Sequence, residues 1–130
     1  MRNRQGFTLV EIMIVVAIIA LLASIAIPNL LRAKIAANDA VAQNTLKTMS
    51  TATETYQTSS SWSYPNDMTA LTGATPPYIS KDYCNTTVSG FSYSCTMGAA
   101  GYTFKASPTT RGTSGSSTYT VTTGSILTAQ

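Results

Sequence analysis

The stretch that decides the fold spans residues 7–27 and reads FTLVEIMIVVAIIALLASIAI. Every residue in it is apolar or small except Thr8, Glu11 and Ser24. A helix of about this length crosses a hydrocarbon layer about 30 Å thick. Because apolar side chains surround this helix on all sides, it must be buried in protein or lie in a membrane. A chain of 130 residues has no other element large enough to bury it. We therefore predict a membrane-spanning helix with the two arginines that precede it on the cytoplasmic side.

The composition argues against an enzyme and against a metal centre. The chain has no His, which removes the commonest general base and the commonest metal ligand. Its two Cys cannot supply a zinc site with four protein ligands. Asp67 and Asp82 are too isolated in the sequence for a calcium cage, which needs about six to eight oxygens. We expect no enzymatic activity, no cofactor, no metal and no specific nucleic-acid partner, since the basic residues do not cluster.

Glu11 is the only acid in the apolar stretch. A carboxylate at the middle of a membrane costs about 2.5–3.5 kcal/mol, and such groups are usually paired and functional. The simplest explanation is that Glu11 reaches the lipid headgroups. Alternatively, a cut between Gly6 and Phe7 creates an α-amino group close to Glu11, within one helix or between two subunits packed side by side.

Residues 6–11, Gly-Phe-Thr-Leu-Val-Glu, with the apolar run that follows, resemble the class III signal of type IV prepilins and pseudopilins. The resemblance implies that a membrane peptidase cuts after Gly6 and methylates Phe7, which becomes N-methylphenylalanine. It also implies that Glu11 pairs with the N-terminal amine of a neighbouring subunit during filament assembly. Pro28 lies where this family places a helix-kinking proline. The implied partners are copies of the chain, a prepilin peptidase and a pilus assembly machinery.

An ordinary secretory signal is the main alternative explanation for the N-terminus. Residues 24–26 would then be a small-x-small cleavage site, and the mature chain would begin at Ile27. Three features oppose it: the apolar run is longer than the usual core of such a signal, it contains Glu11, and Pro28 closely follows the cut.

After Pro28 the chain predicts a second, amphipathic helical part. Pro28 removes a backbone hydrogen bond and is expected to kink the helix or break it locally. Residues 29–59 then contain no Gly and no further Pro, and Ser59–Ser61 is expected to end the helix. Apolar residues recur every seven positions at Ile35, Ala42, Met49 and Tyr56, with Leu46 and Thr53 on the same stripe and Asp39 interrupting it.

The C-terminal part predicts an antiparallel sheet. Residues 91–97 and 102–106 alternate between large and small or polar side chains, and residues 119–123 form a third such segment. This period of two is typical of strands with one face packed on a helix. Residues 68–71 are expected to form one helical turn. The predicted fold class is α+β: a long N-terminal α-helix, half transmembrane and kinked near Pro28, packed by a small antiparallel β-sheet head.

Two further sites are predicted in this head. Cys84 and Cys95 are expected to form a disulfide, because two Cys in an exported domain usually do so. A loop this short is worth about 3 kcal/mol of stability. Asn85 begins the triplet Asn-Thr-Thr, a candidate glycosylation site, although a solvated polar surface is the more ordinary explanation of this region.

The sequence thus predicts a structural protein in four parts. Residues 1–6 form a leader removed on maturation, 7–27 a transmembrane and filament-core helix, 28–59 an amphipathic continuation, and 60–130 a loop and β head domain. By resemblance, the chain is a pilin of a type IV pilus that serves adhesion, twitching motility or DNA uptake. The precursor would lie in the inner membrane with a periplasmic head, and the assembled filament would be extracellular. The alternatives are a pseudopilin of a type II secretion system and a monomeric membrane-anchored or secreted binding domain. The absence of acids after Asp82 favours the pilin, because major pseudopilins often carry an acidic calcium loop there.

Overall fold

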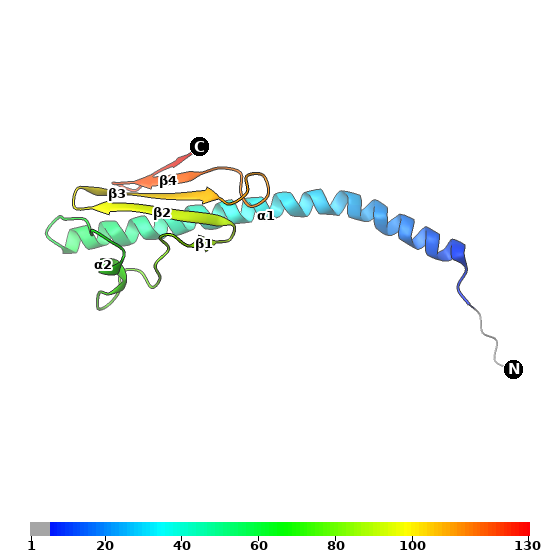
Figure 1. The fold of residues 1–130 in the computed structure, drawn as a ribbon, viewed down its shortest axis with the longest axis horizontal. Coiled ribbons are helices and arrows are strands. Elements are labelled where there is room, and N and C mark those ends of the chain that lie inside the picture. Colours follow the sequence, from blue (N-terminus) through cyan, green and yellow to red (C-terminus); the bar gives the residue numbers. More distant parts are fainter. Residues whose placement is uncertain (1–5) are drawn as a thin grey trace. The chain divides into compact units, whose positions relative to one another are not determined.

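The structure is a computed structural model that describes residues 6–130, so the predicted positions of Arg2 and Arg4 lie outside the described residues. The main helix α1 runs over Leu9–Ser59, and a single helical turn, α2, over Thr69–Thr72 (Figure 1). Five strands follow, namely β1 Thr87–Val88, β2 Phe91–Gly98, β3 Gly101–Pro108, β4 Tyr119–Thr122 and β5 Ile126–Ala129. The α+β prediction is confirmed.

Backbone contacts divide the chain into two compact units, Met1–Ala33 and Lys34–Gln130, and α1 contributes to both. We call the second the head unit. The predicted domain boundaries, after residues 6, 27 and 59, stay predictions. Within α1 the helical backbone continues through Pro28 without interruption, so the local break does not occur. The kink itself stays a prediction.

The sheet is an antiparallel meander in which the strands are ordered β1-β2-β3-β4-β5. Its longest ladder pairs β2 with β3, from Phe91 opposite Pro108 to Gly98 opposite Gly101. On β2 and β3 alternate side chains are buried, as the period of two predicts. The sequence predicted three strands, and β1 and β5 were missed. β1 has only two residues, and β5 is mostly exposed, so neither carries an alternating pattern.

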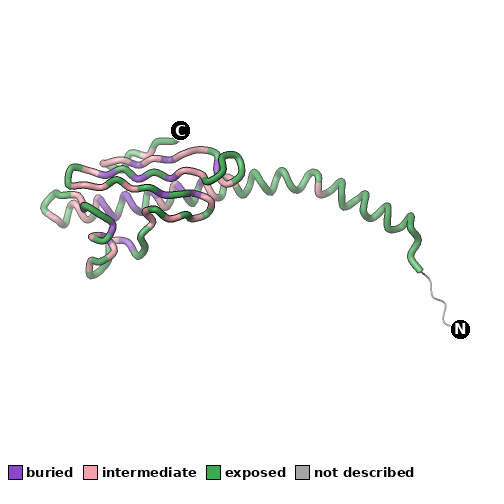
Figure 2. The backbone as a smooth tube through the Cα atoms, in the orientation of Figure 1, coloured by how far each residue is buried: buried purple, intermediate pink, exposed green. Residues whose placement is uncertain are grey.

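The core of the head unit lies between the C-terminal half of α1 and one face of the sheet (Figure 2). Its fully buried large side chains include Leu46 and Met49 from α1 and Phe91, Tyr93, Phe104 and Val121 from the strands. Each such side chain contributes about 1.5–3 kcal/mol through its removal from water. On the predicted stripe Ala42, Leu46, Met49 and Thr53 are buried, whereas Ile35 and Tyr56 are only half-buried.

Asp39 fastens α1 to the loop between β3 and β4. Its side chain is 9% exposed, and it accepts hydrogen bonds from the backbone N–H of Ser116 at 3.0 Å and from the Ser116 hydroxyl at 2.5 Å. The neighbouring Asn38 donates to the carbonyl of Ser114 at 2.8 Å. The sequence suggested that Asp39 interrupts the apolar stripe. In the structure Asp39 is instead buried with the stripe, and its carboxylate satisfies a backbone N–H of the loop.

Glu54 makes a second polar connection, farther along α1. Its Oε1 accepts hydrogen bonds from the Tyr102 hydroxyl and from the backbone N–H of Gly124, each at 2.8 Å, and its Oε2 accepts one from the Tyr64 hydroxyl at 3.0 Å. This one carboxylate thus joins the helix to β3, to the β4–β5 turn and to the loop that follows α1. Bonds of this kind, with an ionised acceptor, are stronger than neutral ones.

Candidate functional site

The first turn of α1 is closed by a reciprocal pair of side chains, Thr8 and Glu11. The Thr8 hydroxyl accepts a hydrogen bond from the backbone N–H of Glu11 at 3.2 Å. In return, Glu11 Oε2 accepts from the backbone N–H of Thr8 at 2.7 Å and from its hydroxyl at 2.8 Å. This is a capping box, which satisfies N–H groups that the start of a helix leaves without partners. This motif was not predicted, although Thr-x-x-Glu before an apolar run signals it.

The capping box occupies only one of the two carboxylate oxygens of Glu11. Both bonds to Glu11 from Thr8 end on Oε2, and within residues 6–130 no hydrogen bond to Oε1 is found. Glu11 is exposed, so Oε1 is accessible to a further donor. The predicted pairing of Glu11 with a Phe7 amine stays a prediction.

The predicted cleavage site lies just before this cap. Residues 6–8 form neither helix nor strand, and α1 begins at Leu9. Phe7 is 86% exposed, and a side chain added at Gly6 would meet no atom within 4 Å. The Gly6–Phe7 peptide bond is therefore accessible, which a peptidase requires. Cleavage and methylation themselves stay predictions.

The N-terminal part of α1 exposes a continuous apolar surface. Its large apolar side chains from Leu9 to Leu31 are between 39% and 75% exposed. Among the described residues α1 is the one helix long and apolar enough to cross a membrane, and its most apolar window is not buried within the structure. The apolar surface extends past Pro28, because Leu30 is 72% exposed.

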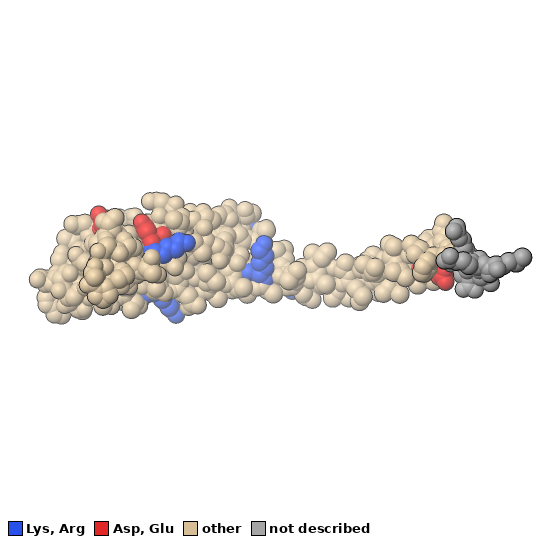
Figure 3. Space-filling view, turned by 90° about the horizontal axis from the view of Figure 1, so that it is seen from below, with Lys and Arg blue, Asp and Glu red and all other residues tan. Residues whose placement is uncertain are grey.

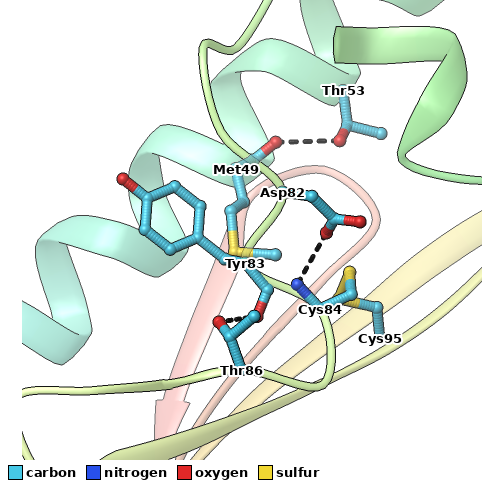
Figure 4. The surroundings of a disulfide bond; sticks show 7 residues. All are labelled: Met49, Thr53, Asp82, Tyr83, Cys84, Thr86 and Cys95. Atoms are coloured by element: carbon cyan, nitrogen blue, oxygen red, sulfur yellow. Dashed lines mark hydrogen bonds between the residues drawn. A yellow bond between two sulfur atoms is a disulfide. The ribbon is translucent and has the colours of Figure 1, made fainter.

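The disulfide between Cys84 and Cys95 is present, as predicted (Figure 4). It joins the segment that precedes β1 to the middle of β2, with Cα atoms 5.5 Å apart. Asp82 Oδ1 accepts a hydrogen bond from the Cys84 N–H at 2.8 Å and so shapes the turn next to the bridge. In Figure 4 the side chain of Met49 points from α1 towards this segment. The bridge thus constrains a stretch that has little regular structure of its own.

Asn85 follows the bridge in an exposed turn with φ at 57°. Its backbone N–H donates to the carbonyl of Tyr93 at 2.9 Å. Glycosylation of Asn85 stays a prediction.

Asp67 and Asp82, far apart in the sequence, line one cavity of about 460 Å³ beside the disulfide. The Thr69 hydroxyl and the Ala70 N–H, at 3.1 Å, donate to Asp67 Oδ1, and these bonds lower the pKa of the Asp67 carboxyl. Sequence separation had suggested that the two acids are isolated, and the folded chain brings them to the same surface. Within residues 6–130 no group of three or more His, Cys, Asp or Glu side chains is arranged to hold a metal ion.

A comparison with known protein families concerns the N-terminal segment. Residues 1–27 match the family model described as the prokaryotic N-terminal methylation motif. The match concerns this N-terminal segment alone. The motif covers the accessible Gly6–Phe7 bond, the Thr8–Glu11 cap and most of the exposed apolar surface.

Two curated relatives of this pilin-like chain are type IV pilus subunits. It is 48% identical over 71 residues to the type IV wide pilus major component PilA4 of Thermus thermophilus, a match that covers 55% of this chain and 53% of the relative. It is 49% identical over 55 residues to the type IV major pilin protein PilA of Myxococcus xanthus, covering 42% of this chain and 24% of that relative. The matches thus span about half of the first relative's length and about a quarter of the second's. No solved structure gave a significant match.

Proposed function

We propose that the chain is a pilin, the structural subunit of a type IV pilus, and that it polymerises through the apolar N-terminal part of α1. The observation that carries this proposal is the exposed apolar surface from Leu9 to Leu31, directly after an accessible cleavage site in a methylation motif. The names of the two relatives support a pilus subunit over a pseudopilin.

Such a surface is unfavourable in water, so lipid or protein must cover it. Burying one large aliphatic side chain contributes about 1.5–3 kcal/mol, and this part of α1 exposes many of them. Lipid acyl chains can cover the surface in the precursor, and α1 helices of other copies can cover it in a filament. Assembly then exchanges one apolar environment for another, so it needs no large exposure of the helix to water.

We propose the following course of events. The precursor lies in the inner membrane with its head unit in the periplasm, and a prepilin peptidase cuts after Gly6 and methylates Phe7. The new amine of one copy then pairs with the Glu11 carboxylate of a neighbouring copy. The assembly machinery transfers the subunit to an extracellular filament, which serves attachment, twitching movement or DNA uptake.

Electron microscopy of material sheared from the cells that make this protein tests the proposal. We expect long filaments whose subunit begins at N-methylated Phe7 by intact-mass measurement. The control is Gly6→Lys, which should leave uncut precursor in the membrane and no filaments. Because a side chain at Gly6 meets no atom within 4 Å, a loss in this variant reports on processing and not on folding. A soluble monomer that begins at Ile27 would refute the proposal, and short cell-bound fibres alone would indicate a pseudopilin.

A further inference from the structure

The charged residues of the first unit bracket its apolar surface at a separation that matches a membrane. Glu11 and Arg32 are the nearest charges on either side of residues 12–31, which carry none. A helix rises about 1.5 Å per residue, so these two charges lie about 31 Å apart along α1. The hydrocarbon layer of a bilayer is about 30 Å thick. On the face shown in Figure 3, α1 carries no charged atoms between the acid near its beginning and the first basic side chain.

The backbone before α1 independently limits where the hydrocarbon-spanning segment can begin. Residues 6–8 are not helical, so not all of their backbone N–H and C=O groups can be satisfied within the segment. Hydrocarbon offers no water to satisfy such groups, and lipid-exposed irregular backbone does not occur there. A span that begins at Phe7 would place this irregular stretch in lipid, whereas a span that begins at Ile12 leaves it and the capping box among the headgroups.

From these two limits we infer that the hydrocarbon-spanning segment is residues 12–31, not 7–27, and that Arg32 fixes its depth by binding lipid phosphates at the far surface. Arg32 is exposed, and a guanidinium binds phosphate oxygens in a bidentate manner. The apolar surface reaches this boundary, since Leu30 and Leu31 are both exposed. Glu11 then lies at the opposite boundary, where its carboxylate costs little, and the Gly6–Phe7 bond lies outside the hydrocarbon. This inference rests on the proposed membrane anchor.

Depth-dependent fluorescence quenching separates the two spans. In a Trp62→Phe background, the full-length precursor would carry one tryptophan, at Ala17→Trp or at Leu22→Trp, in vesicles of phosphatidylcholine and phosphatidylglycerol with brominated lipids. The centre of 12–31 is near residue 22, and the centre of 7–27 is residue 17. We expect Leu22→Trp at the bilayer centre and Ala17→Trp about 7 Å shallower. The reverse order would overturn the inference while leaving the anchor intact. Two tryptophans that stay outside the hydrocarbon would overturn the membrane anchor itself.

Moving the cation tests the role of Arg32 at constant net charge. The variant Asn29→Arg with Arg32→Leu moves the first cation three residues towards the N-terminus, or about 4 Å along the helix. We expect the tryptophan at position 22 to move away from the bilayer centre by about this distance. The matched control, Arg32→Lys, keeps a cation in place and should leave the depth unchanged. An unchanged depth in the relocated variant would show that Arg32 does not set it.

Discussion

Two buried tyrosines of the head unit should respond in opposite ways to the loss of a hydroxyl. The Tyr102 hydroxyl donates to Glu54 Oε1 at 2.8 Å, lies 2.8 Å from the Ser50 hydroxyl and accepts from the Ser125 N–H at 3.3 Å. The Tyr93 hydroxyl is buried and has no hydrogen-bond partner among residues 6–130. The same chemical change, Tyr→Phe, therefore removes a satisfied group at one site and an unsatisfied group at the other.

The expected magnitudes follow from hydrogen-bond energetics. A hydrogen bond to a charged group contributes about 1.5–3 kcal/mol, so Tyr102→Phe should lower the free energy of unfolding by about 2 kcal/mol. For a unit of this size that corresponds to a fall in Tm of roughly 8–16 °C. A buried polar group without a partner costs about 1–3 kcal/mol. Because the phenylalanine fills the same space, Tyr93→Phe should leave the free energy of unfolding unchanged or raise it by about 1 kcal/mol.

The assay is guanidinium unfolding of the full chain in a mild detergent, followed by the near-ultraviolet circular dichroism of the tyrosines, with the disulfide intact. If the unfolding free energy has the same dependence on guanidinium concentration in the parent and in both variants, the transition midpoints can be compared as stabilities. If Tyr93→Phe proved as destabilising as Tyr102→Phe, the difference between the two hydroxyl environments would be refuted.

The same pair predicts the alkaline limit of stability. Burial raises the pKa of both Tyr93 and Tyr102, and the hydrogen bond between Tyr102 and Ser50 partly opposes this rise at Tyr102. A phenol whose pKa is raised on folding contributes stability that is complete below pH about 10, the unfolded value, and is lost as the pH rises above it. In the same unfolding assay, the free energy of unfolding of each Tyr→Phe variant should therefore fall less between pH 9 and pH 11 than that of the parent, because one of the two raised phenols is absent.

Four further predictions test single contacts. Asp39→Ala should release the loop held by Ser116, and trypsin should then cut after Arg111 faster than in the parent or in the exposed-site control Asn44→Ala; an unchanged rate would mean that Asp39 does not hold the loop. Cys84→Ser with Cys95→Ser should lower the unfolding free energy by about 2–3 kcal/mol, measured with denaturant, and an unchanged midpoint would contradict this. Because hydrogen bonds lower the pKa of Asp67, an NMR titration should find it below that of an ordinary Asp, and Thr69→Ala should return it towards the ordinary value; stability from this group is present above pH about 4 and is lost below it. Glu11→Gln keeps a capping acceptor without the charge, so it should retain the helix start but, like Glu11→Ala, lose filaments under the electron microscope; normal filaments would mean that the charge is not needed.

What the sequence predicted well is what depends on local pattern. The end of α1 at Ser59, the turn at α2 and the alternation of β2 and β3 follow from residues close together in the chain. The contact between Asp39 and Ser116 joins residues 77 positions apart, and no local pattern signals it. β5 was missed for a different reason: its side chains are mostly exposed, so burial imposes no period on them.

The acidic residues of this chain share one use that the sequence alone did not show. All five Asp and Glu side chains accept a hydrogen bond from a backbone N–H, the donors being those of Thr8, Ser116, Gly124, Ala70 and Cys84. In a charge-poor protein the carboxylates thus serve first to satisfy backbone donors at a helix start, in turns and in loops. For Glu11 this has a consequence for assembly, because its backbone donor occupies only Oε2. An amine can bind Oε1 without opening the helix cap, so the same carboxylate can hold the start of α1 in the precursor and bind a cation after cleavage. Capping the helix and setting the register of a neighbouring copy are then compatible tasks for one side chain.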